Sequence, residues 1–205
     1  MPATESRQES YGQAGLTPVD RLGVYLSRRA IARELPQLPG QVLDLGCGYD
    51  APLLNWLTER GFRGTGIDVS FSPETLANPQ LTTLEGVIEE RLDELPPGSF
   101  QCIFAISVLE HIWQPEGIIA KAHELLEPGG KLVVNVPTWL GRYALEFSAF
   151  KLSFSPKLEM DDHKSYYNKR NLWPLLRAAG FLPSDMTLRY HKFGLNLFAV
   201  AQRTA

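Results

Sequence analysis

The stretch VLDLGCGYDAPLL, residues 42–54, determines how the rest of the chain is interpreted. It begins with an apolar run that predicts a short buried strand, followed by Gly46 and Gly48, which are separated by one residue. Pro52 then suits the first turn of a helix, because the backbone N–H that proline lacks has no partner at that position. The pattern predicts a strand that turns sharply into a helix and exposes backbone to a ligand at the turn.

Two classes of ligand fit this turn. Gly46, Gly48 and Ala51 satisfy the G-x-G-x-x-G/A pattern of nicotinamide dinucleotide sites, and Asp68 follows at about the 20-residue interval of such sites. The same residues also suit S-adenosylmethionine, whose ribose hydroxyls can donate hydrogen bonds to Asp68. Asp44 favours the second ligand, because a carboxylate repels a pyrophosphate but attracts a sulfonium and an ammonium group.

Strand-like and helical segments alternate along the chain. Strands are predicted at 42–45, 63–70, 81–87, 101–109 and 131–137, with two more within 185–202. Helices are predicted from 52, over 115–130 with a Pro-Gly-Gly stop, and over 168–181. The last two strands are joined at Phe193-Gly194 by a link too short for a crossover helix, so they must be antiparallel. This indicates an α/β fold with a Rossmann-like, doubly wound sheet, mostly parallel with an antiparallel last strand.

The length of 205 residues suits one globular domain. We expect residues 1–17 to form a flexible tail and residues 18–205 to form a single domain with an N-terminal helix at 18–40. The alternation is interrupted at 139–165, which predicts a lid-like insert.

The composition narrows the classes of partner. Twenty basic and 23 acidic residues give a net charge of −3, which argues against a nucleic-acid partner. No apolar run reaches the roughly 18 residues that a membrane span needs. The two cysteines, Cys47 and Cys102, lack the spacing of a metal site, so neither a metal nor a disulfide framework is expected. A cytoplasmic location fits this cysteine usage.

Five segments in this order resemble class I S-adenosylmethionine-dependent methyltransferases that act on small molecules, of the type 11/23 group. They are VLDLGCG (42–48), GTGIDVS (64–70), FAISVLEHI (104–112), LLEPGGKLVVNVP (125–137) and LLRAAGF (175–181). The resemblance extends from Gln41 to Arg203 and implies a seven-stranded sheet, S-adenosylmethionine as the cofactor and methyl transfer as the activity.

The resemblance implies roles for residues near the first two strands. Asp44, Gly46 and Gly48 would hold the methionine part of the cofactor, with Cys47 contributing its backbone. Asp68 would bind both ribose hydroxyls.

The adenine side of the implied site departs from the family. Val69 would pack on the adenine, and many members carry an acid after the third strand to bind its amino group. Here Gly86 is followed by Val87 and Ile88, so their backbone groups would take that role. Ser107 would contact the cofactor through its backbone.

Candidates for catalysis lie after the fourth strand and after the insert. His111 is either a general base or a histidine that packs beneath the next helix. His163 and Tyr167 either close over the substrate or belong to a loop that His163 anchors. Tyr143, Phe147, Phe150 and Phe154 recur at helical spacing within the insert and indicate a lid or part of the core.

The function we expect is transfer of a methyl group from S-adenosylmethionine to an O, N or C nucleophile of a small or medium-sized acceptor. Such a reaction needs mainly alignment of the nucleophile with the methyl carbon. Two alternatives stay open: an NAD-dependent oxidoreductase, and a catalytically silent cofactor-binding interaction module.

Overall fold

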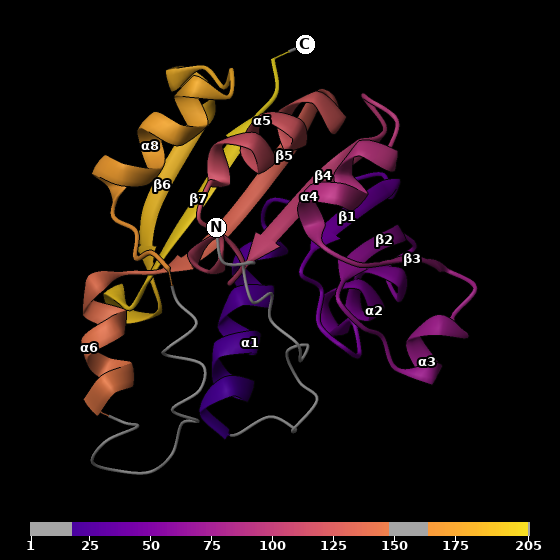
Figure 1. Cartoon of the computed structure of the whole chain (residues 1–205), viewed down its shortest axis with the longest axis horizontal. Coiled ribbons are helices and arrows are strands. Elements are labelled where there is room, and N and C mark those ends of the chain that lie inside the picture. The colour runs from indigo at the N-terminus through magenta and orange to yellow at the C-terminus, as the bar shows by residue number, and fades with distance from the viewer. Residues whose placement is uncertain (1–17, 148–163, 205) are drawn as a thin grey trace, which may run out of the picture.

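The computed structural model describes residues 18–147 and 164–204. Its centre is a seven-stranded sheet in the order β3-β2-β1-β4-β5-β7-β6 (Figure 1). The strands are β1 (Gln41–Leu45), β2 (Arg63–Asp68), β3 (Leu81–Glu85), β4 (Phe100–Ile106), β5 (Leu126–Pro137), β6 (Met186–His191) and β7 (Asn196–Gln202). Strand β7 pairs antiparallel with both β5 and β6, and the other pairs are parallel, so the predicted fold class is confirmed.

Helices cover both faces of this sheet (Figure 1). They are α1 (Pro18–Ile31), α2 (Pro52–Thr58), α3 (Pro73–Leu76), α4 (Ile88–Arg91), α5 (Pro115–Leu125), α6 (Trp139–Phe147) and α8 (Lys169–Ala178). Short 3-10 turns are η1 (Leu92–Glu94), η2 (Leu109–His111), η4 (Pro183–Asp185) and η5 (Lys192–Gly194). One apolar core joins α1 and α2 to the sheet, and the other joins α5 and α8 to its opposite face.

The two C-terminal strands follow the predicted hairpin closely. Only η5 and Leu195 separate β6 from β7, and Phe193 has a positive φ of 59° within that turn. A link of this length has no room for a crossover helix, which is the physical reason for the antiparallel pairing.

The predicted helix at 115–130 was wrong in its C-terminal part. Helix α5 ends at Leu125 and β5 begins at once, so the Pro128-Gly129-Gly130 segment lies inside a strand. The pairing with β4 shifts there between Phe100 and Cys102. A Cβ on Gly130 would lie 2.9 Å from the Phe100 carbonyl oxygen, so the glycine allows close strand contact rather than ending a helix.

The N-terminal helix is shorter than predicted. Helix α1 ends at Ile31, whereas 18–40 was expected. The predicted insert begins with α6, but the predicted tail 1–17 and the segment 148–163 lie outside the described residues. In the described part of the chain, no helix has the length and apolarity to cross a membrane.

Candidate active site

The turn after β1 is held by backbone conformations that favour glycine. Gly46 and Gly48 have φ values of 61° and 81°, and Ala51 has a φ of 43° at the N-cap of α2. A Cβ on Gly46 would lie 2.7 Å from Cγ2 of Val108, just beyond β4. The turn therefore depends on glycine at 46 for both its conformation and its contact with the end of β4.

This turn is fastened to the carboxyl end of β2. The backbone N–H of Gly46 donates to the carbonyl of Ile67 at 2.8 Å. The two oxygens of Asp68 accept from the backbone N–H groups of Gly48, at 2.7 Å, and Val69, at 2.8 Å. The structure thus brings the predicted methionine-binding glycines and the predicted ribose-binding carboxylate into direct contact.

Asp44 adds a second carboxylate beside this contact. It lies at the end of β1 with 3% of its surface exposed. Burial, and then the charge of Asp68, raise the pKa of the Asp44 carboxyl well above its ordinary value. Two close carboxylates repel each other, so this corner of the crevice favours a ligand that brings positive charge.

Cys47 lies between the two glycines and is buried. Burial, with the charges of Asp44 and Asp68, raises the pKa of its thiol far above the ordinary value. A thiol held in the neutral form is a poor nucleophile, which agrees with the expected contribution through backbone alone.

The predicted adenine-binding residues follow β2 and β3. The backbone N–H of Gly86 donates to the Asp68 carbonyl at 2.9 Å, so Val87 and Ile88 follow β3 close to the carboxylate that is predicted to bind the ribose. The side chain of Val87 is 37% exposed, and Ile88 begins α4. Because the first N–H groups of a helix have no acceptor within that helix, the backbone of Ile88 is oriented for contact outside α4.

Ser107 directly follows β4, at the carboxyl edge of the sheet where the strand order reverses between β1 and β4. It is exposed, has a φ of 58° and donates its backbone N–H to the Asn135 carbonyl at 2.8 Å. In an open α/β sheet, such a reversal at the carboxyl ends of strands is where ligands bind. Contact between the backbone of Ser107 and the cofactor stays a prediction.

Tyr167 ties the chain after the insert to this edge of the sheet. It is 4% exposed, its hydroxyl donates to the Leu109 carbonyl at 3.1 Å, and its backbone N–H donates to Pro137 at 3.1 Å. Burial, and then the charge of Glu110, raise the pKa of the phenol to about 12. The geometry gives Tyr167 a positioning contact between the ends of β4 and β5.

His111 and helix α6, which begins the predicted insert, lie near the segment 164–167. His111 is half-buried in η2, and the neighbouring Glu110 carbonyl accepts from the backbone of Lys164 at 2.6 Å. On α6, Tyr143 is 62% exposed, and Trp139 contacts the ring of Tyr166 with centroids 5.3 Å apart. His163, Phe150 and Phe154 lie outside the described residues, as does the side chain of Phe147.

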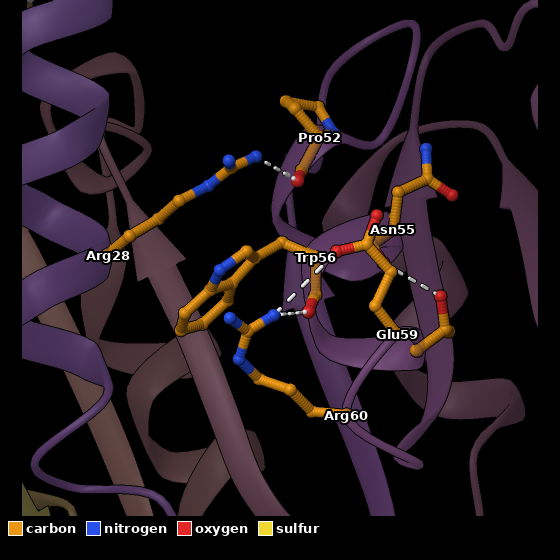
Figure 2. Close-up of polar contacts among 7 residues, drawn as sticks. Arg28, Pro52, Asn55, Trp56, Glu59 and Arg60 are labelled. Atoms are coloured by element: carbon orange, nitrogen blue, oxygen red, sulfur yellow. Dashed lines mark hydrogen bonds and ion pairs between the residues drawn. The ribbon is translucent and has the colours of Figure 1, made fainter.

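Helix α1 is fastened beside the glycine turn through contacts that the sequence did not reveal (Figure 2). The Arg28 guanidinium donates to the Pro52 carbonyl at 2.7 Å, directly after the turn. The ring of Trp56 has the Arg60 guanidinium at 4.1 Å and that of Arg28 at 5.8 Å from its centroid. No pattern in α1 signals this partner, since it comes from 24 residues away.

Asn135, near the same edge of the sheet, is a residue that no sequence motif singled out. It is 0% exposed at the carboxyl end of β5, and neither side-chain polar atom has a hydrogen-bond partner within the described residues. The available signal was a single amide in the otherwise apolar segment KLVVNVP. A buried amide without partners is uncommon in folded proteins and calls for an explanation.

Comparison with known proteins also indicates a methyltransferase. A family model described as a methyltransferase domain matches residues 21–182. A ubiquinone biosynthesis O-methyltransferase from Nitrosococcus oceani is 33% identical over 135 residues, which are 60% of this chain and 56% of that enzyme. The enzyme of the same name from Pseudomonas syringae is 29% identical over 157 residues, which are 71% of this chain and 66% of that enzyme. The chain thus spans only about half to two thirds of these relatives.

Solved structures show the same fold at low identity. A SAM-dependent methyltransferase from Archaeoglobus fulgidus has a TM-score of 0.66 at 14% identity, covering 88% of this chain and 93% of that one. A possible histamine N-methyltransferase from Thermotoga maritima has a TM-score of 0.65 at 17% identity, covering 91% and 92%. Because the family model matches most of the chain, the protein belongs to the methyltransferase-domain family, with the fold of class I S-adenosylmethionine-dependent methyltransferases.

Proposed function

We propose that this protein transfers a methyl group from S-adenosylmethionine to a hydroxyl oxygen of a small ring-shaped acceptor. The observation that carries the proposal is the contact between the Gly46–Gly48 turn and Asp68, with Asp44 buried beside it. The choice of oxygen rests on the matched relatives, which are named O-methyltransferases.

The residues of the crevice fit this cofactor. Gly46 leaves no room for a side chain beside Val108, so backbone alone borders the ligand there. Asp44 and Asp68 favour a ligand that carries a sulfonium and an ammonium group over one that carries a pyrophosphate. When bound, S-adenosylmethionine supplies a methyl group on a positively charged sulfur, which leaves as a neutral thioether.

The residues of the chain bind the cofactor and orient the acceptor. Asp68 is fixed by two backbone N–H groups and still has lone pairs for ribose hydroxyls. Val87 and the backbone of Ile88 frame the adenine, and Ser107 borders the crevice from β4. Alignment of an acceptor with the methyl carbon contributes up to about 7–11 kcal/mol of barrier reduction.

A hydroxyl acceptor also needs a group that takes its proton, which contributes on the order of 10²–10⁴-fold in rate. His111, His163 and Tyr167 stay predictions for that role. Among them, Tyr167 is the weakest, because its hydroxyl already donates to the Leu109 carbonyl. The proposed setting is the cytoplasm, in keeping with the two buried free thiols of Cys47 and Cys102.

The proposal is tested by calorimetry with S-adenosylhomocysteine and with NADH. We expect S-adenosylhomocysteine to bind and Asp68→Ala to weaken it at least about 100-fold, which corresponds to about 2.7 kcal/mol. Asp50→Ala is the matched control, because it removes an exposed carboxylate from the same turn. Tight binding of NADH alone would support the oxidoreductase instead.

Methyl transfer itself is measured with labelled S-adenosylmethionine and a catechol (1,2-dihydroxybenzene) as the hydroxyl probe, with a primary amine in parallel. Label on the catechol supports O-methylation, and label on the amine alone overturns the choice of oxygen. Binding of S-adenosylhomocysteine without transfer to any hydroxyl, amine or carbon probe would favour the catalytically silent module.

A further inference from the structure

The unpartnered amide of Asn135 lies on a defined face of the sheet. Asn135 is in register with Ile106 of β4 and with Phe198 of β7. Because strand side chains alternate between faces, Asn135 projects to the same face as Val133 and Phe198, which pack in the core beneath α1 and α2. Asp44 is in register with Phe104 and so projects to this face as well.

The strand order separates two sets of polar groups along this edge. Asp68 and Asp44 lie near the carboxyl ends of β2 and β1, whereas Asn135 lies near the carboxyl end of β5, on the other side of β4. The residues proposed for the ribose and the methionine part therefore lie on one side of Ser107, and Asn135 lies on the other. A methyl acceptor has to approach from that second side, because the first is taken up by the cofactor.

A second buried polar atom without a hydrogen-bond partner among the described residues, Nε2 of His191, lies close to Phe198. Its ring lies 5.6 Å from that of Phe198, the residue registered with Asn135. Nε2 of His191 is buried and has no hydrogen-bond partner in the described part of the chain. The ring also interacts with the backbone of Leu26 in α1. Asn135 and His191 thus flank Phe198 and each keep unused hydrogen-bonding capacity.

We propose that Asn135 and His191 form the binding site for the polar groups of the methyl acceptor, on either side of Phe198. This inference rests on the proposed function. The amide of Asn135 both donates and accepts, and Nε2 of His191 offers one further position for a hydrogen bond. The site suits a small planar acceptor with a hydroxyl and a second polar substituent, such as a catechol. Phe198 lies between them in the sheet, and the Arg189 guanidinium of β6 lies 4.9 Å from the centroid of its ring.

Helix α1 covers this site in the structure. Ala30 and Ile31 pack in the same core as Phe198, and Figure 1 shows α1 between α6 and α2 at the end of the sheet where the strand arrows point. Arg28 fastens the helix to Pro52 by one hydrogen bond. The proposed acceptor site is therefore covered in this structure, and the proposal requires α1 to move for the acceptor to enter.

The first test measures stability without any ligand. Asn135→Leu keeps the branching and the number of heavy atoms and removes both unpartnered polar groups, so we expect the Tm to rise, because replacing an unsatisfied buried amide by an apolar group relieves its desolvation cost. A lower Tm would show that the amide contributes to the fold and would overturn the proposal. This readout depends on neither cofactor nor acceptor.

The second test measures binding and turnover in the complete protein. Asn135→Leu and His191→Asn should each raise the KM for catechol at least tenfold, while affinity for S-adenosylhomocysteine changes less than twofold. His191→Gln, whose amide reaches near the position of Nε2, should recover part of the loss. The matched control is His123→Asn, because His123 contacts Phe181 on the opposite face.

The outcomes separate the two proposals. If the wild type fails to bind S-adenosylhomocysteine, the proposed function is wrong, whatever the stability of Asn135→Leu. If the wild type methylates catechol and both variants do so with an unchanged KM, the acceptor site is wrong and the proposed function stands.

Discussion

The two halves of the sheet's carboxyl edge differ in how their polar groups are satisfied. On the β1–β2 half, both oxygens of Asp68 accept hydrogen bonds from backbone N–H groups of the adjoining turns. On the β5–β7–β6 half, Asn135 and Nε2 of His191 are buried without partners among the described residues. In the first half, the polar groups are already satisfied by the protein. In the second half, burial of unpaired polar atoms costs free energy, which hydrogen bonds from a ligand would recover. The proposed cofactor site on the first half and the proposed acceptor site on the second would account for this difference.

The largest expected effect comes from a substitution at Gly46, in the turn between β1 and α2. Gly46→Ala should weaken binding of S-adenosylhomocysteine on the order of 100-fold, measured by calorimetry. The new Cβ would clash with Val108, and the φ of 61° at this position is unfavourable for alanine. Gly98→Ala is the control for backbone strain alone, since Gly98 has a φ of 65° and nothing within 4 Å of the added Cβ. The double change Gly46→Ala with Val108→Ala should recover part of the affinity. An unchanged affinity in Gly46→Ala would contradict the close approach of this turn to the cofactor.

A smaller effect is expected at Asp44, where the pKa of the carboxyl is raised by burial and by Asp68. Such a group binds more protons in the folded state, so its stabilising contribution is lost as pH rises above the unfolded value of 3.8 toward the folded pKa. Asp44→Asn should therefore raise the Tm of the ligand-free protein more at pH 7 than at pH 4. Each kcal/mol of added unfolding free energy corresponds to a rise in Tm of roughly 2–4 °C. Thermal unfolding at the two pH values checks this.

The same variant sharpens the assignment of the methionine end. Asp44→Asn should weaken S-adenosylmethionine about tenfold, or about 1.4 kcal/mol, and should weaken S-adenosylhomocysteine less, because the latter lacks the sulfonium charge. Asp50→Asn is the control within the same turn. Equal affinities for S-adenosylmethionine in the wild type and Asp44→Asn would place the cation elsewhere.

The smallest effect is expected at Tyr167, which contacts the chain at the ends of β4 and β5. Tyr167→Phe removes the hydrogen bond to Leu109 and should cost about 1 kcal/mol of unfolding free energy, measured by denaturant titration, with kcat within twofold of the wild type. Tyr190→Phe, at an exposed position on β6, should change neither quantity. A kcat reduced more than 100-fold with normal stability would instead support the predicted catalytic role of Tyr167.

Features encoded over short stretches were predictable. Helix-period and strand-period patterns gave the alternation of elements, and the short link at Phe193-Gly194 required the antiparallel end. The glycine turn and Asp68 were found because their spacing follows from the geometry of one strand–helix–strand unit. Where a local signal had two readings, the prediction was wrong: the glycines at 129 and 130 accommodate a strand irregularity and do not end α5.

By itself, the sequence determined the fold class and predicted a cofactor site at the β1–β2 half of the edge, because both depend on residues close together along the chain. Only the tertiary structure decided that Asn135 and His191 flank Phe198, that Arg28 holds α1 beside Pro52, and that Tyr167 joins the ends of β4 and β5. Each of these arrangements joins elements distant in sequence. Whether a buried amide finds a partner is a property of the assembled core, and no local pattern encodes it.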